Sequence, residues 1–143
     1  MQEVANDGEF EARARNRNVV IQRADACTVN GFDELLRSAV ENVVRNAIRH
    51  TAAGTAVEIS LHVVDSRALL RVTDHGPGVP ESMLSEIFLP FRRVANGNPD
   101  GAGLGLAIAE RAVNVHGGTI RAFNSPNGGL IVEIDLQLAS SPH

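Results

Sequence analysis

The stretch DGAGLGLAIAERAVNVHG, residues 100–117, decides the fold that we expect for this chain. It opens with glycines on alternate positions, continues as an apolar-periodic helix and stops at Gly117 and Gly118. The opening glycines are Gly101, Gly103 and Gly105, and the predicted buried face is Leu106, Ala109, Ala112 and Val113. Glycines that lead into a helix expose backbone N–H groups at the positive end of the helix dipole, where phosphates bind. The stretch therefore predicts a phosphate-binding loop followed by a helix.

Upstream, apolar periodicity predicts a long helix over residues 33–50. Its predicted buried stripe is Leu36, Val40, Val43, Val44 and Ala47. At about 100° per residue, Asn42, Asn46 and Arg49 share an arc of about 60° opposite that stripe. The amide oxygen of Asn46 is a hard ligand suited to Mg²⁺, and Asn42 can hold a phosphate or a water. A solvated helix face would carry the same residues, so this pattern alone does not indicate a site.

Period-two alternation predicts a hairpin of strands over 56–64 and 68–73 that runs into Asp74-His75-Gly76-Pro77-Gly78. A carboxylate at the end of an apolar strand can accept a hydrogen bond from an exocyclic amino group such as that of adenine. Gly76 and Gly78 would let a flat ring approach the backbone closely. Asp, Gly and Pro also favour ordinary turns, so both readings stay open here.

The remaining segments complete a single expected domain over residues 19–138. We expect strands at 19–22, 27–30, 119–124 and 130–138, a short helix at 81–87 and a lid up to Gly103, with Arg92 and Arg93 at its edge. Residues 1–18 would be a linker that contains the end of a helix near 9–17, and residues 139–143 a disordered tail.

Composition excludes several classes of protein. The chain has 143 residues and a net charge of −4, which gives no support to a nucleic-acid partner. All 13 basic residues are arginine, so a Walker P-loop and lysine-dependent catalysis are excluded. The single cysteine, Cys27, fits a reducing cytoplasm, and no apolar run is long enough to span a membrane.

Four segments occur in one order along the chain: ENVVRNA (41–47), DHGPG (74–78), FLPFRR (88–93) and GAGLGL (101–106). They resemble the N, G1, F and G2 boxes of sensor histidine kinases of two-component systems. The sequence around each box is most similar to the envelope-stress, Cpx-type branch. The resemblance covers residues 9–138. It implies the Bergerat ATP-binding fold, a two-layer α/β sandwich with a mixed, mainly antiparallel sheet, helices on one face and an ATP lid.

The resemblance also implies roles for individual residues. Asp74 would bind the adenine amino group, with Gly76 and Gly78 beside the ring, and Asn46 would coordinate Mg²⁺. Phosphate contacts would come from Asn42, Arg49 and the lid arginines Arg92 and Arg93, with Asn42, Asn46 and Arg93 acting in phosphoryl transfer. The G2 residues would hold the triphosphate: Gly101, Gly103, Leu104, Gly105 and Leu106. The implied cofactors are ATP and Mg²⁺.

One departure from the family pattern concerns the phosphoacceptor histidine. None of the five histidines has the expected context of an acidic residue followed, three residues later, by proline. The chain therefore resembles the catalytic part of a membrane-bound sensor, located in the cytoplasm and monomeric on its own. Its partners would be the phosphoacceptor helical hairpin of the parent kinase and a response regulator.

Three alternatives remain open. An ATP hydrolase of the DNA gyrase kind would need a glutamate one turn before Asn46, where Asn42 stands, and an amide is a poor base. Glu41 is adjacent to Asn42 but points about 100° away from it.

A free-standing anti-sigma factor with serine kinase activity fits the chain length, and capture of a sigma factor would support this alternative. A nucleotide-sensing domain without phosphotransfer is the third.

Overall fold

The computed structural model of the chain describes residues 17–24, 33–84, 86–89 and 105–138. The strands are β1 (Asn18–Ala24), β2 (Ala56–Val64), β3 (Arg67–Thr73), β4 (Thr119–Asn124) and β5 (Leu130–Gln137). The helices are α2 (Asp33–His50) and α3 (Gly105–Val115), with a 3₁₀ turn, η1 (Glu81–Met83), between β3 and α3. Both long helices and both hairpins therefore lie where the sequence predicts them.

The described strands form one five-stranded sheet in the order β1-β2-β3-β5-β4. Only β1 and β2 run parallel, and the other neighbouring pairs are antiparallel. The β2–β3 hairpin turns through Asp65, whose φ of 54° is in the left-handed region that short hairpin turns require. The predicted mixed, mainly antiparallel sheet is confirmed.

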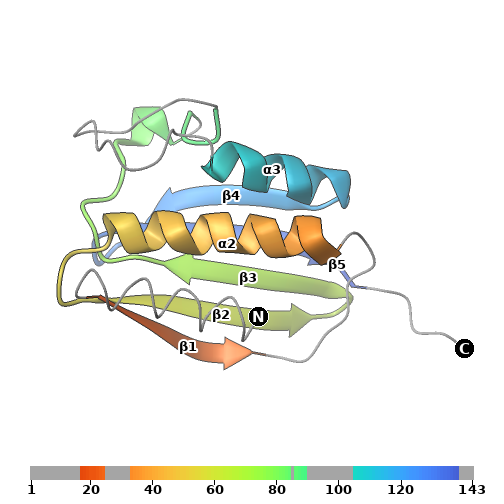
Figure 1. Cartoon of the computed structure of the whole chain (residues 1–143), viewed down its shortest axis with the longest axis horizontal. Helices are drawn as coiled ribbons and strands as arrows, with labels where there is room; N and C mark the ends of the chain where they lie inside the picture. The colour runs from red at the N-terminus through yellow and green to blue at the C-terminus, as the bar shows by residue number, and fades with distance from the viewer. Residues whose placement is uncertain (1–16, 25–32, 85, 90–104, 139–143) are drawn as a thin grey trace, which may run out of the picture.

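Both described helices lie on the same face of the sheet, as Figure 1 shows, so the fold is the predicted two-layer α/β sandwich. Alternate strand residues point into the layer between sheet and helices, because successive side chains of a strand face opposite ways. The strands supply to this core Val57, Ile59, Leu70, Val72, Leu130, Val132 and Ile134. The helices supply Ala39, Val43, Val44, Ala47, Ile48, Leu106, Ala109, Ala112 and Val113.

On the other face of the sheet, the described residues form ion pairs. Glu133 on β5 is 2% exposed and lies between Arg71 on β3 and Arg121 on β4. Its carboxylate accepts a hydrogen bond from each of these arginines. Burial raises the pKa of Glu133, but the hydrogen bonds from Arg121 and Arg71 outweigh it and leave the pKa lowered. Arg67 and Asp135 add a second pair at 2.6 Å. These ion pairs make the part of this face around β3, β5 and β4 charged.

Some expectations for local structure were wrong or fall on residues outside the described part. The predicted helix over 81–87 is a 3₁₀ turn of three residues, Glu81–Met83, that continues as turns. On α2, Leu36 and Val40 are only half-buried, whereas Ala39 and Ile48, absent from the predicted stripe, are fully buried. Ala39 and Ile48 lie about 180° apart on the helix, so the buried face of α2 is wider than the predicted stripe. The strand at 27–30, all but the last residue of the helix near 9–17, and the lid lie outside the described residues. No helix among those described is both long and apolar enough to cross a membrane.

Candidate functional site

Asp74 lies directly after β3, at the end of the molecule where α2 also ends (Figure 1). Its side chain is buried, 2% exposed, and its Oδ1 atom accepts hydrogen bonds from the backbone N–H groups of Gly76 at 2.9 Å and Leu130 at 3.1 Å. The backbone N–H of Asp74 donates to the carbonyl oxygen of Leu130 at 3.0 Å. The carboxylate is therefore fixed through one oxygen, and Oδ2 forms no hydrogen bond to any described residue.

The environment of Asp74 also shifts the pKa of its carboxyl group. Burial raises the pKa of the Asp74 carboxyl, while the hydrogen bonds from Gly76 and Leu130 and the nearby His50 and His75 offset part of this effect. A buried carboxylate with one free oxygen is stabilised by any ligand that donates a hydrogen bond to it. The geometry therefore favours a ligand with an N–H group at this position.

Around Asp74, the backbone packs so closely at two glycine positions that neither position has room for a Cβ atom. A Cβ on Gly76 would lie 1.9 Å from the backbone oxygen of His50, at the end of α2. A Cβ on Gly129, in the turn between β4 and β5, would lie 2.0 Å from the backbone oxygen of Asp74. Gly76 is thus required for contact with α2 and Gly129 for contact with the β4–β5 turn. From the sequence, we expected Gly76 only to let the flat ring of a ligand approach the backbone.

Thr51 links the end of α2 to the same turn. Its Oγ1 atom accepts a hydrogen bond from the backbone N–H of His75 at 3.0 Å and lies 2.7 Å from Thr55 Oγ1. Its backbone oxygen accepts a hydrogen bond from Arg17 at 2.7 Å, and the residue is 1% exposed. Thr51 therefore holds the position of the Asp74 turn relative to α2.

We expect Thr51→Val to lower the free energy of unfolding by about 1–2 kcal/mol, since valine keeps the shape but leaves the His75 N–H without its acceptor. Chemical denaturation measures the change. Thr51→Ser, which keeps the hydroxyl group and loses only a methyl group, serves as the control and should retain most of the stability. Equal unfolding midpoints for Thr51→Val and the unmodified chain would contradict the assignment.

Asn42, Asn46 and Arg49 lie together on α2, half-buried rather than on a solvated face. The amide nitrogen of Asn42 donates to the backbone oxygen of Ser38 at 2.8 Å, and its Oδ1 faces the start of α3, 3.4 Å from where a Cβ on Gly105 would lie. The side chain of Asn46 forms no hydrogen bond within the described residues. The Nε atom of Arg49 is buried and likewise lacks a partner there. This face of α2 therefore presents two amide oxygens and an unsatisfied cationic donor.

The start of α3 completes the described part of the site. α3 begins at Gly105, and Leu106 is buried in the core beneath it, so Leu106 anchors the helix rather than facing solvent. Because Gly105 lies against Asn42, the first turn of α3 and the polar face of α2 are neighbours. The remaining predicted phosphate contacts lie outside the described residues: Arg92, Arg93, Gly101, Gly103 and Leu104.

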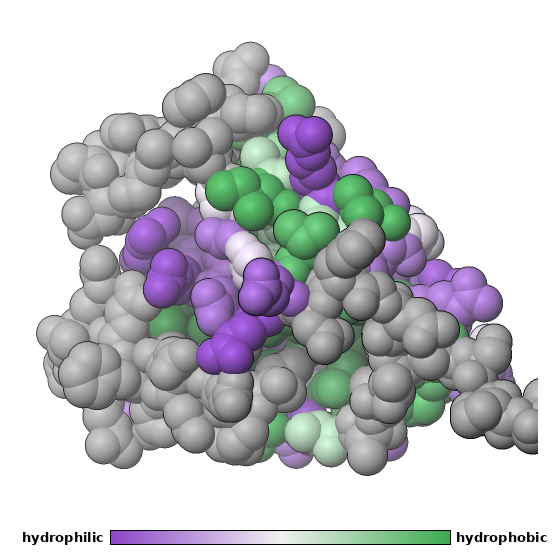
Figure 2. Space-filling view, turned by 45° about the vertical axis from the view of Figure 1, so that its right-hand side comes forward, coloured by the Kyte–Doolittle hydropathy of each residue, from purple (hydrophilic) through white to green (hydrophobic). Residues whose placement is uncertain are grey.

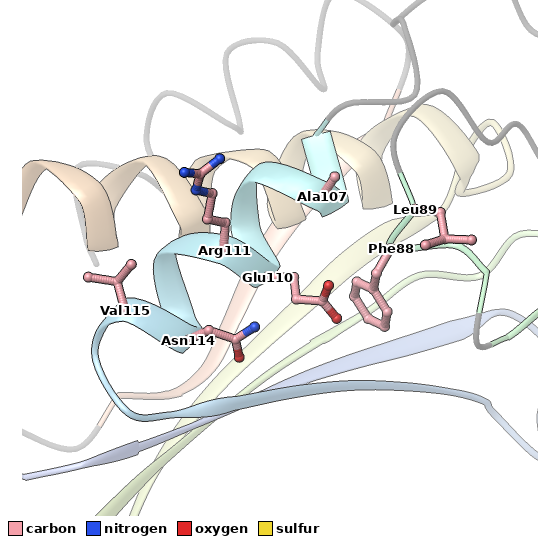
Figure 3. A pocket seen from close by; sticks show the side chains of 7 residues that line it. All are labelled: Phe88, Leu89, Ala107, Glu110, Arg111, Asn114 and Val115. Carbon is pink, nitrogen blue, oxygen red and sulfur yellow. The ribbon is translucent and has the colours of Figure 1, made fainter.

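A separate hollow of about 440 Å³ lies on the outer side of α3, shown in Figure 3. Its lining is Phe88, Leu89, Ala107, Glu110, Arg111, Asn114 and Val115. None of these residues belongs to the predicted nucleotide site. Exposed apolar residues on the helices include Leu35, Ile108 and Val115, and Figure 2 shows apolar and strongly hydrophilic side chains intermixed on one face of the molecule.

Sequence reasoning missed the residues that hold the Asp74 turn. The sequence patterns assign no role to Thr51 or Gly129 and place Leu130 only at the start of a strand. Leu130 acts through its backbone, which leaves no signature in residue type. The sequence does contain a glycine pair, Gly128-Gly129, that could have pointed to this contact. A glycine pair does not show, however, which of the two glycines packs against another segment.

A family model described as histidine kinase-, DNA gyrase B-, and HSP90-like ATPase matches residues 31–140. The chain belongs to this ATPase family. The match includes α2, the Asp74 turn and α3, so the ATPase domain contains every described residue of the site.

Curated relatives of this ATPase domain are sensor proteins. The sensor protein CutS of Streptomyces coelicolor is 36% identical over 133 residues, which cover 90% of this chain and 32% of CutS. The sensor histidine kinase CpxA of Escherichia coli K12 is 36% identical over 140 residues, covering 95% of this chain and 30% of CpxA. The chain thus spans about a third of the length of these relatives.

Solved structures show the same ATPase fold. The mycobacterial sensor histidine kinase MprB superposes with a TM-score of 0.82 at 31% identity, covering 99% of this chain and 97% of that one. Full-length ShkA, solved in complex with AMPPNP, superposes with a TM-score of 0.84 at 26% identity, covering 99% of this chain and 30% of that one. The fold and family predicted from the four sequence segments are confirmed.

Proposed function

We propose that the chain is the catalytic ATP-binding domain of a two-component sensor histidine kinase, which transfers the γ-phosphate of ATP to a histidine outside this chain. The observation that carries the proposal is the buried Asp74 carboxylate, fixed through Oδ1 with Oδ2 left to accept a hydrogen bond. Adenine presents an exocyclic amino group, which is a donor, and guanine presents an acceptor at the equivalent position. Asp74 therefore selects adenine.

The phosphate end of the nucleotide would lie along the polar face of α2. The buried, unsatisfied Nε of Arg49 fits an anion, and the uncommitted amide of Asn46 fits Mg²⁺, which prefers oxygen ligands. The amide hydrogens of Asn42 are directed to Ser38, so its oxygen is the atom it offers, through Mg²⁺ or a bound water. When bound, Mg²⁺ would neutralise charge on the phosphates. The G2 residues and the lid arginines, Arg92 and Arg93, would complete the phosphate contacts.

The geometry favours phosphoryl transfer to a partner over hydrolysis. Water activation needs a carboxylate one turn before Asn46, and Asn42 stands there. The neighbouring Glu41 is engaged by Arg37 at 3.1 Å on an exposed side of α2. We therefore expect the isolated chain to bind ATP without hydrolysing it at an appreciable rate.

The test is a calorimetric titration with ATP, with and without Mg²⁺, of the chain and of Asn46→Ala. We expect Mg²⁺ to strengthen ATP binding to the unmodified chain and Asn46→Ala to lose about tenfold in affinity, together with its response to Mg²⁺. Asn114→Ala, which removes an exposed asparagine on α3, is the matched control. An unmodified chain that binds no ATP at millimolar concentration would overturn the proposal.

A second measurement separates the kinase from the hydrolase. The chain is mixed with labelled ATP and the phosphoacceptor hairpin of its parent sensor, and transfer is read as acid-labile, base-stable phosphohistidine on the hairpin. Release of inorganic phosphate by the chain alone, at the same rate with and without the hairpin, would favour the hydrolase.

The wider arrangement follows from the same proposal. The parent protein would be a membrane-bound sensor with this domain in the cytoplasm, and the phosphohistidine would pass its phosphate to a response regulator. The catalytic domain would comprise residues 19–138, preceded by the linker 1–18 and followed by the tail 139–143. The isolated domain would be monomeric.

A further inference from the structure

The loop from Asp74 to Val79 is attached at both ends to the base of the β4–β5 hairpin. At its start, Asp74 exchanges two hydrogen bonds with the backbone of Leu130. At its end, Val79 exchanges two with the side chain of Asn124: the Val79 N–H donates to Oδ1 at 2.9 Å, and Nδ2 donates to the Val79 oxygen at 2.6 Å. Asn124 and Leu130 are themselves paired across β4 and β5. One rung of the sheet therefore holds both ends of the loop.

The amide of Asn124 also shapes the middle of the loop. Gly78 has a φ of +74°, and a Cβ there would lie 2.8 Å from Asn124 Oδ1. The side chain of Asn124 thus occupies the space on one side of Gly78 and fixes the direction in which the loop turns. Val79 beyond it packs against the hydrophobic core, which holds the end of the loop in place.

We propose that Asn124 is a positioning residue for the base of the bound nucleotide, acting through Gly78 and Val79 without touching the ligand. The inference rests on the proposed function, since the loop concerned is the one that would face adenine. An amide is the side chain that both accepts from a backbone N–H and donates to a backbone C=O of the same residue. Aspartate keeps only the acceptor, and leucine, of similar size, keeps neither.

The test compares Asn124→Leu with the unmodified chain by calorimetry, using ATP, adenosine and magnesium tripolyphosphate as three probes. We expect ATP and adenosine to bind about tenfold more weakly to Asn124→Leu, because two hydrogen bonds that position the base loop are lost. Tripolyphosphate, which has no base, should bind with unchanged affinity. Asn127→Leu is the matched control, because Asn127 lies in the same hairpin, is exposed, and its side chain forms no hydrogen bond within the described residues.

A second readout is amide hydrogen exchange, which we expect to quicken at Val79 in Asn124→Leu and not in Asn127→Leu. The inference is overturned if Asn124→Leu binds adenosine as tightly as the unmodified chain, or if it loses affinity for all three probes equally. If Asn124→Leu does not fold, Asn124→Asp is judged by the same comparison. An unmodified chain that binds none of the probes refutes the proposed function instead.

Discussion

Asp74→Asn is expected to weaken ATP binding about 100-fold while leaving the fold intact. The new amide oxygen can accept the same hydrogen bonds from Gly76 and Leu130 that Oδ1 of Asp74 accepts, so the side chain should keep its position. The amide nitrogen then replaces Oδ2 and directs a donor at the amino group of adenine, which is also a donor. Two donors repel, and neither is satisfied.

Calorimetry with ATP and GTP measures this effect, and the ratio of the two affinities is the more informative quantity. Guanine offers an acceptor where adenine offers an amino group, so Asp74→Asn should shift the ratio toward GTP. Asp135→Asn is the matched control, because Asp135 lies on the outer face of the sheet, where it pairs with Arg67. Unchanged ATP affinity in Asp74→Asn would remove Asp74 from the base-binding site.

The same variant has a predictable pH dependence. Folding raises the pKa of Asp74, so its contribution to stability is complete below the pKa of the unfolded chain and is lost as pH rises through the native pKa. Asparagine does not titrate. Relative to the unmodified chain, Asp74→Asn should therefore gain stability as pH increases through this range, which denaturation at several pH values measures.

Gly129→Ala is expected to lower the free energy of unfolding by about 3 kcal/mol. Gly129 has a φ of +97°, which costs an L-residue about 1–2 kcal/mol, and its Cβ would also lie 2.0 Å from the backbone oxygen of Asp74. The turn must move away from Asp74 to admit the methyl group. That movement also disturbs the Leu130 N–H that holds the carboxylate, so ATP binding should weaken as well.

Gly128→Ala separates the two contributions. Gly128 has a nearly equal φ of +92°, but nothing lies within 4 Å of its Cβ position. Its substitution by alanine should cost only the conformational strain of the backbone, about 1–2 kcal/mol, and leave ATP affinity unchanged. Chemical denaturation of both variants provides the comparison. If the two lose the same stability, contact between Gly129 and Asp74 is not what requires glycine at position 129.

Sequence patterns predicted the fold well because the elements are long and strongly periodic. The spacing of apolar residues located α2 and α3, and alternation located β2 and β3, while β4 and β5 were located as a second hairpin. The helix expected at 81–87 was wrong, although apolar residues are available there, because so short a segment closes too few backbone hydrogen bonds to offset the cost of starting an α-helix. Ile48 was missed because it lies at the edge of the predicted stripe, and the buried face of α2 is wider than that stripe.

The sequence pointed to some residues of the candidate site and not to others, and the difference has a physical reason. Residues that we propose to act through their side chains leave a trace in the sequence: the Asp74 carboxylate suits an amino group, and Asn46 lies in the segment that resembles the N box. Residues that act through backbone atoms or through close approach, such as Leu130 and Gly129, have no such signature. Their contribution depends on which segments meet in space, and Asp74 and Leu130 are 56 positions apart.

The attachment of Asp74 to the β4–β5 hairpin also affects the order in which the protein gains its activity during synthesis. At about 5–20 residues per second, Leu130 is added several seconds after Asp74. Throughout that interval the nascent chain contains α2, β2 and β3 but lacks the strand that fixes the carboxylate. Nucleotide capture should therefore mark the completed domain, and ATP would stabilise only molecules whose last strand has joined the sheet.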